Sequence, residues 1–257
     1  MSIIYDNTKI KLIYLDTNAI SEFISNTNNF TINLEKKFST CNCELCFNMN
    51  NIIELKNGYI ERYNNFLNIF SSIPCIIFKF YPNIIREELN YAINKKFNFE
   101  NISFSVVPNS LKEYDLKNII ENYLYEEDIV EEELLLNFMN HLKNDFSNFT
   151  QFDKKYEYSI IENTLKQFNY NANYEIDLND FPATRLINKS FYNRIVKGKK
   201  ENIKKNDIHD IMISSVSPYV DVIITEAYQI NLIKEAKRHI KQLDNLQCYK
   251  VSDFFNK

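Results

Sequence analysis

Residues 11–23 read KLIYLDTNAISEF, a pattern that indicates a strand turning directly into a helix. The apolar run 12–15 is typical of a buried parallel strand, and it ends at Asp16. Thr17 and Asn18 favour a helix start, and apolar residues then recur at helical spacing. This arrangement places the Asp16 carboxylate at the carboxyl edge of a sheet, where open α/β folds bind ligands. Asp16 is therefore either a helix cap or part of a site.

The composition indicates a globular protein. The chain has 257 residues, of which 45% are hydrophobic and 25% charged, enough for one large domain or a domain with a substantial insertion. Only two glycines are present, which excludes glycine-rich phosphate loops. The net charge of −4 means that nucleic-acid contact would depend on a local basic patch. With no signal peptide and no apolar run long enough for a bilayer, we expect a cytoplasmic protein that does not contact membranes.

The cysteines do not suggest a disulfide framework or a zinc site. Their number is odd, and Cys41, Cys43 and Cys46 have no second pair of ligands nearby in the sequence. Cys43 and Cys46 fall on or beside a predicted strand, where cysteine behaves as a small hydrophobic residue. We therefore expect structural thiols.

The pattern of strand, acid and helix occurs again along the chain. Residues 44–47 are predicted to form a strand, followed by a helix with Glu54 in its first turns. Residues 220–225 (VDVIIT) form another buried run that ends at Thr225, and Glu226 follows at once. If these strands are parallel neighbours, their acids meet at the same sheet edge.

A late helix supplies a further acid. Residues 207–215 are predicted to be helical, with Asp210 near the start. Asp207 lies three residues earlier on the same helix face and is either a metal ligand or the helix cap. Asp221 opens the strand that precedes Glu226, so we expect it at the opposite sheet edge in a structural role.

Residues 57–204 are expected to differ from the rest. They are predicted to form a mostly helical insertion packed on a core made of 1–56 and 205–257. Within this insertion, residues 75–80 favour a short strand and residues 98–110 an irregular segment.

Carboxylates that converge in one cleft repel one another unless cations are present. Mg²⁺ and Mn²⁺ prefer oxygen ligands and need no histidine or cysteine. Such ions activate water and neutralise charge on a phosphoryl group, which suits phosphodiester hydrolysis.

Three segments together resemble the PIN-domain ribonucleases: YLDTNAISEF at 14–23, NNIIELK at 50–56, and NDIHDIMISSVSPYVDVIITEA at 206–227. The resemblance implies a three-layer α/β/α PIN-like fold with a central parallel sheet, here carrying a large helical insertion. It implies the catalytic metal ligands Asp16, Glu54, Asp210 and Glu226, supporting roles for Asn18 and Thr225, and one or two Mg²⁺ or Mn²⁺ ions. The sequence departs from the family at Glu226, since the family more often has Asp one residue further on.

A basic segment precedes the late helix and is the best candidate for binding phosphates. It reads GKKENIKK at 198–205, with further basic residues just before it. The predicted substrate-binding residues are Arg194, Lys197, Lys199, Lys200, Lys204 and Lys205.

The carboxylate cluster predicts a metal-dependent nuclease, and the resemblance implies internal cleavage with RNA favoured over DNA as the substrate. The resemblance also suggests a toxin or antiviral role, and the insertion suggests a surface for a protein inhibitor or other partner. Three alternatives stay open: a non-catalytic PIN-like nucleic-acid-binding or scaffold module, a DNase, and a phosphatase of the haloacid-dehalogenase type. The last of these needs a second Asp at the position of Asn18.

Overall fold

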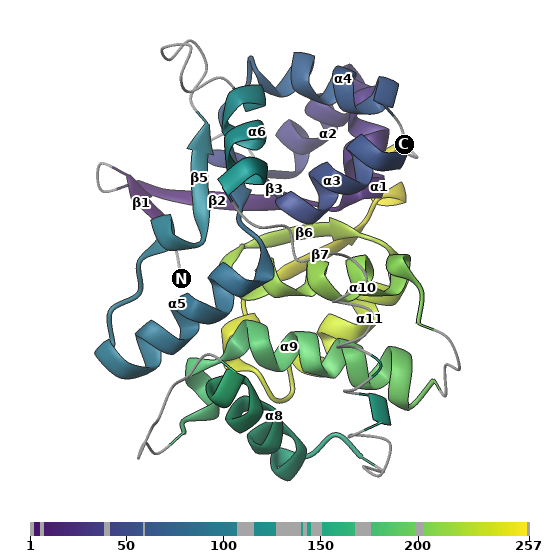
Figure 1. The fold of residues 1–257 in the computed structure, drawn as a ribbon. Helices are drawn as coiled ribbons and strands as arrows, with labels where there is room; N and C mark the ends of the chain where they lie inside the picture. Colours follow the sequence, from purple (N-terminus) through teal and green to yellow (C-terminus); the bar gives the residue numbers. More distant parts are fainter. Residues whose placement is uncertain are drawn as a thin grey trace.

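The computed structural model of the chain has an α/β fold whose elements follow one another from purple to yellow in Figure 1. The structure describes residues 3–5, 8–38, 42–58, 60–106, 116–126, 140, 143–144, 151–167, 176–198 and 203–255.

The central sheet has the strand order β5-β4-β3-β2-β6-β7, and β1 pairs with β2 outside this path. In the spatial order β4-β3-β2-β6-β7, each strand is parallel to its neighbour. At the margins, β5 is antiparallel to β4, and β1 is antiparallel to β2. The strands are β1 (Ile3–Tyr5), β2 (Thr8–Leu15), β3 (Cys43–Asn48), β4 (Cys75–Phe78), β5 (Ser103–Val106), β6 (Val222–Thr225) and β7 (Gln247–Lys250). The expected mainly parallel α/β sheet is confirmed.

Helices cover both faces of the sheet (Figure 1). On one face lie α1 (Thr17–Ser25), α2 (Thr27–Phe38), α3 (Met49–Gly58), α4 (Ile60–Phe70) and α6 (Leu116–Glu126). On the other lie α5 (Tyr81–Asn94), α8 (Lys154–Gln167), α9 (Pro182–Phe191), α10 (Lys205–Met212) and α11 (Ala227–Ala236). The remaining helical elements are η1 (Phe99–Asn101), η3 (Leu178–Asp180), the π-helix η4 (Tyr192–Val196), the 3-10 helix η5 (Ile213–Tyr219), η6 (Lys241–Leu243) and α12 (Ser252–Phe255).

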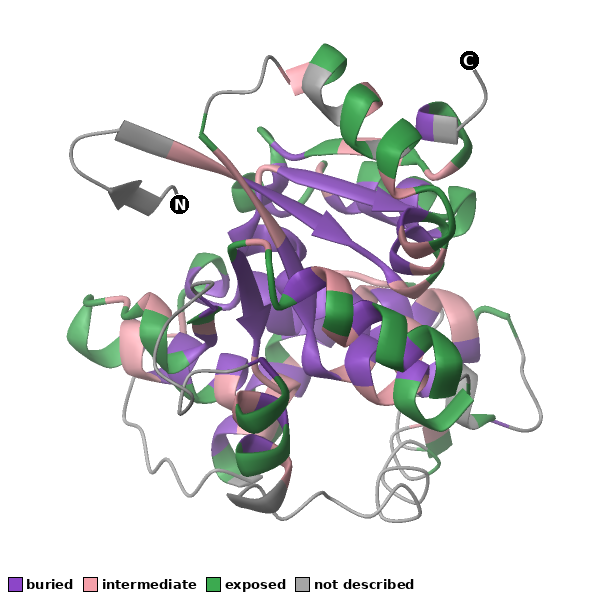
Figure 2. Ribbon diagram, turned by 90° about the horizontal axis from the view of Figure 1, so that it is seen from above, coloured by how far each residue is buried: buried purple, intermediate pink, exposed green. Residues whose placement is uncertain are grey.

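The strand β2 shows how the sequence supports both layers. Its side chains alternate, so Ile13 and Leu15 join one hydrophobic cluster while Leu12 and Tyr14 join the other. All four are essentially inaccessible to solvent, as Figure 2 shows for the central strands in general. A continuous apolar run is therefore what a central strand with two covered faces requires.

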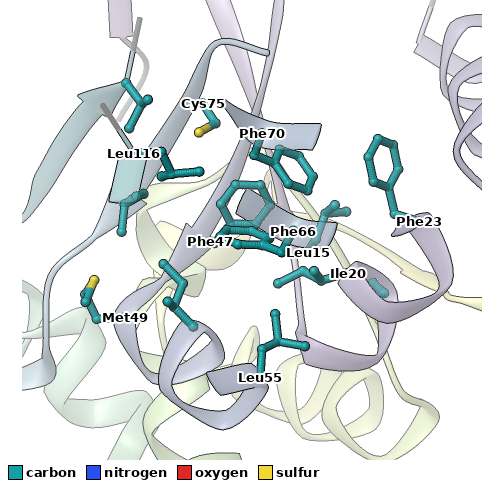
Figure 3. Packing of buried hydrophobic residues seen from close by; sticks show 14 of the residues in the cluster. Leu15, Ile20, Phe23, Phe47, Met49, Leu55, Phe66, Phe70, Cys75 and Leu116 are labelled. Carbon is teal, nitrogen blue, oxygen red and sulfur yellow. The ribbon is translucent and has the colours of Figure 1, made fainter. Parts of the chain in front are cut away.

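Aromatic residues fill the first cluster (Figure 3). The ring of Phe47 on β3 lies 4.6 Å from that of Phe70 and 5.3 Å from that of Phe66, both on α4. These edge-to-face contacts hold α4 on the sheet. These three phenylalanines are thus core residues.

The segment 57–204 differs from the expected insertion because it takes part in the sheet. Its strand β4 pairs with β3, and β5 pairs with β4. The expectation that 98–110 is irregular is therefore wrong for β5, whose burial on a neighbouring strand outweighs its weak local pattern. Much of 107–150 lies outside the described residues.

Buried acids connect the helices of the second layer. Glu88 on α5 accepts hydrogen bonds from the backbone N–H groups of Ala183 and Thr184 at the start of α9, at 2.5 and 3.1 Å. The hydroxyls of Thr184 and Tyr219 donate to the same carboxylate at 2.6 and 2.7 Å. Glu88 therefore caps α9 and ties it to η5.

A buried ion pair extends this layer outward. Arg185 on α9 contacts the Glu157 carboxylate at 2.8 Å and donates to the backbone oxygen of His239 at 2.7 Å. Both charged side chains are about 5% exposed.

In the part of the chain that is described, no helix is both long and apolar enough to cross a membrane.

Candidate functional site

The sheet has a topological switch point between β2 and β6. From β2 the chain proceeds through β3 and β4 on one side, whereas β6 and β7 lie on the other. The register pairs Leu15 with Ile224, so Asp16 and Thr225 come side by side where the two strands end. The carboxyl edge at such a point is the usual ligand position in open α/β sheets.

Asp16 is fixed by hydrogen bonds to both carboxylate oxygens. Its Oδ1 accepts from the backbone N–H of Ala19 at 2.7 Å, so Asp16 does cap α1. Its Oδ2 accepts from the Thr225 hydroxyl on β6 at 2.6 Å. Asp16 is only 5% exposed, and this burial raises its pKa to about 6. The residue is thus both a cap and a buried acid on the pocket wall.

Glu54 is positioned by a chain of polar contacts from β2 to α3. At the start of α3, Asn48 and Asn51 cap each other, each side-chain oxygen accepting from the other's backbone N–H. The Tyr14 hydroxyl donates to the Asn51 side-chain oxygen at 2.6 Å, and the Asn51 amide donates to the Thr17 hydroxyl at 2.9 Å. Thr17 in turn donates to Glu54 Oε2 at 2.5 Å. Glu54 is therefore held toward the Asp16 edge.

Glu226 occupies the same structural position after β6 that Asp16 occupies after β2. It is the N-cap residue of α11, with extended backbone, but its side chain does not cap the helix. Instead its Oε1 accepts a hydrogen bond from the Asn18 amide of α1. The carboxylate is thereby held beside the start of α1, and both residues line the same pocket.

Asp210 on α10 is bound by an arginine. Nη2 of Arg194 contacts Asp210 Oδ2, and Nε contacts Asp207 Oδ1 at 2.8 Å. The guanidinium also lies 5.4 Å from the ring centre of Tyr228. Burial raises the pKa of Asp210 against the lowering effect of Arg194, and the charges of Glu54 and Glu226 raise it further. The negative charges of Glu54, Glu226 and Asp210 therefore repel one another across the pocket.

The acids border a pocket of about 620 Å³. Its lining consists of Asp16, Thr17, Asn18, Glu54, Asn193, Arg194, Gly198, Asp210, Ile213, Thr225, Glu226, Tyr228 and Gln229. Four carboxylates thus face one guanidinium, so the lining is strongly acidic when all of these groups are ionised.

The donors suit a hard divalent cation in kind, because all are carboxylate oxygens. Their placement is less suited: among the described residues, no three histidine, cysteine or acidic side chains are grouped closely enough to hold a metal ion. Arg194 gives a physical reason, since it engages Asp210 where a cation would compete. Binding an ion would require that pair to open.

Asp207 stands apart from the four acids. It is 2% exposed, and its Oδ2 accepts the Lys204 backbone N–H at 2.9 Å while Oδ1 pairs with Arg194. Among the described residues it is not part of the pocket lining. The helix begins earlier than expected, with Lys204 as its N-cap, so Asp207 is not the N-cap residue but the third helical residue, whose side chain accepts from the N-cap backbone.

The basic segment reaches the pocket only in part. Arg194 and Gly198 line it, but Arg194 points at carboxylates. Lys197 and Lys204 are exposed and, as far as the described lining goes, lie outside the pocket. Lys199 and Lys200 lie outside the described residues, and Lys205 begins α10.

The site also contains polar residues that the sequence pattern does not single out. Thr17, Asn51 and Tyr228 organise or line the pocket. The adjacency of Thr17 to Asp16, and the three-residue spacing from Asn51 to Glu54, were the available signals. The role of Tyr228 depends on contacts between segments that are distant in the sequence, which no local pattern predicts.

Asp221 is structural, as expected: its Oδ2 accepts from the Leu12 backbone N–H at 3.0 Å.

No family model matches the chain, and neither a curated protein nor a solved structure shows significant similarity to it.

Proposed function

We propose that this protein is a PIN-like, Mg²⁺- or Mn²⁺-dependent nuclease that cleaves RNA internally. One observation carries the proposal. Asp16, Glu54, Asp210 and Glu226 come from four separate elements spread over most of the chain, yet all line one pocket at the switch point of a parallel sheet. A fold has no structural need to gather four acids there, because like charges in a pocket destabilise it unless a cation compensates.

The residues divide the work of holding such an ion. When bound, Mg²⁺ or Mn²⁺ supplies positive charge for phosphoryl oxygens and a water of lowered pKa. Asp16 and Glu226 would hold it from the strand ends, with Glu54 and Asp210 facing them. Thr225 orients Asp16, Asn18 orients Glu226 and Thr17 orients Glu54.

Asp16→Asn tests the proposal most directly. Asn keeps the oxygen that caps α1 but removes the buried charge, so the fold should persist while cleavage falls by roughly 10²-fold or more. Labelled RNA and single-stranded DNA are incubated with the protein, with and without Mn²⁺. Asp244→Asn, an exposed acid at the other end of the sheet, serves as control. Undiminished cleavage by Asp16→Asn would remove the site from the mechanism.

A non-catalytic nucleic-acid-binding or scaffold module is the second candidate. It is favoured by the Arg194–Asp210 pair and by the lack of a ready ion-binding group among the described residues. Calorimetric titration with Mn²⁺ separates the two. A nuclease binds the ion and loses this binding in Asp16→Asn, whereas a scaffold gives no heat of binding in either form.

A further inference from the structure

A second hollow of about 560 Å³ lies beside the acidic pocket. The two share the wall formed by Asn18, Thr225 and Glu226. The first is bordered by α3, η4 and α10, whereas the second opens between α1, α4 and the end of β7. An extended ligand that reaches the acids therefore has a continuation in the second hollow.

The lining of this hollow has a different chemistry. It carries two cationic side chains, Arg62 from α4 and Lys250 from the end of β7, both exposed. Three serines, Ser21, Ser25 and Ser252, lie around it, and Thr225 of the shared wall is a fourth hydroxyl side chain. Cations with nearby hydroxyl donors are the groups that contact phosphate oxygens in nucleic-acid complexes.

The acidic members of the lining are Glu22 and the shared Glu226. Two cations thus face two carboxylates. Glu226 belongs to the wall that faces the acidic pocket, so a cation bound there would neutralise it. The second hollow would then carry a net positive charge, whereas the first would remain the place for the ion.

We propose that this hollow binds the phosphodiester backbone of a single-stranded nucleic acid on one side of the bond to be cut, with Arg62 and Lys250 contacting the phosphates. The inference rests on the proposed nuclease function, because that function places the reacting phosphate in the neighbouring pocket. It assigns substrate binding to α4 and β7 rather than to the basic segment 198–205.

The test measures binding apart from cleavage. A fluorescent oligouridylate of about 12 nucleotides, a length in the range of single-strand binding sites, is titrated with the otherwise unmodified protein. Ca²⁺ replaces Mg²⁺, because it binds oxygen ligands and so occupies the acidic pocket while cleavage is suppressed. Arg62→Ala/Lys250→Ala should bind roughly tenfold more weakly than the parent. Losing two phosphate contacts should also reduce the slope of log K against log[salt] by about 1.4. An oligothymidylate should show the same loss, since the backbone is what is contacted.

Arg238→Ala/Lys241→Ala is the charge-matched control. Both residues are exposed and follow the C-terminal end of α11, at the sheet edge away from the pockets. This variant should bind like the parent. Arg62→Lys/Lys250→Arg, which keeps the charges, should also retain binding and so exclude a folding defect.

Equal weakening in the two alanine pairs, or an unchanged salt slope in Arg62→Ala/Lys250→Ala, overturns the assignment. The nuclease proposal fails separately, through absence of Mn²⁺-dependent cleavage by the unmodified protein. If the protein binds RNA through Arg62 and Lys250 but does not cleave it, the proposed binding surface stands and the proposed nuclease activity is wrong.

Discussion

At the scale of single residues, Arg194 contacts two carboxylates with different surroundings. The Asp207 side chain is 3% exposed and the Asp210 side chain 45% exposed. The contact with Asp207 is therefore protected from water and belongs to the packing of η4 on α10. The contact with Asp210 is open to competition from ions.

Arg194→Ala should separate these two contributions. It leaves Asp207 buried with fewer partners, so the free energy of unfolding should fall by about 1–3 kcal/mol. It also frees Asp210, so Mn²⁺ should bind roughly fivefold more tightly. Urea denaturation and calorimetric titration measure the two effects, with Arg238→Ala as control. Weaker Mn²⁺ binding would show that Arg194 does not compete with the ion.

Asn51 is a second residue whose role can be isolated. It is fully buried, and it contacts Tyr14, Asn48 and Thr17. Asn51→Ala should lower the free energy of unfolding by about 2–4 kcal/mol, because several buried partners lose their hydrogen bonds at once. Cleavage should also fall, since Thr17 no longer holds Glu54 in place.

Asn50→Ala, on the same turn of α3 and half-buried, is the matched control for this prediction. Its effect on stability should stay within about 0.5 kcal/mol. If the two variants unfold at the same urea concentration, the polar chain from Tyr14 to Glu54 has no role in stability.

At the scale of elements, the two glycines make opposite demands. A Cβ at Gly198, just after η4, would lie 2.4 Å from the backbone oxygen of Arg194. A Cβ at Gly58, the last residue of α3, would meet nothing within 4 Å. Gly198 is therefore required by a close backbone contact, whereas no contact at position 58 requires a glycine.

Gly198→Ala should therefore destabilise the protein by about 1–3 kcal/mol and shift Arg194. Gly58→Ala should stabilise it by about 0.4–1 kcal/mol, since alanine restricts the unfolded chain at no steric cost. Thermal unfolding of both variants measures the difference. Two changes of the same sign would contradict the predicted backbone contact at Gly198.

The elements also show what the sequence could predict. Strands β2 and β6 were predictable because both faces of each are covered, so their apolar runs are continuous. The position of Asp16, Glu54 and Glu226 at one edge of the sheet was also predictable, because each residue lies directly after a strand or near the start of a helix. By contrast, β5 (SFSV) is short, and only its two end residues are buried, so its sequence pattern is weak. The Arg194 contacts join different elements. Such pairings depend on tertiary packing, which no local pattern records.

At the scale of the whole molecule, Glu88 joins three elements of one layer. Its burial raises the pKa to about 7 from an ordinary value of 4.5, even though the hydrogen bonds from Thr184, Tyr219 and Ala183 lower it. A raised pKa means that the folded protein binds this proton more tightly than the unfolded chain. The stabilisation is present below about pH 4.5 and is lost as the pH rises through about 7.

Glu88→Gln should remove this component of the pH dependence. Its amide cannot ionise and mispairs with the donors of α9, so the variant should be less stable than the parent at about pH 5. The difference should shrink by roughly 1–3 kcal/mol at about pH 8. Urea denaturation at both pH values measures this, with exposed Glu162→Gln on α8 as control. A constant difference would mean that Glu88 does not titrate in this range.

The pairing of β2 with β6 has a consequence for the newly made protein. Asp16 and Glu226 directly follow two adjacent strands of the sheet, yet about two hundred residues of chain separate them (Asp16 and Thr225 are 209 positions apart). The acidic pocket therefore cannot close until the segment that reaches Glu226 has left the ribosome. If the pocket cuts RNA, the growing chain cannot attack the message or the ribosomal RNA during the synthesis of the residues between these two strands.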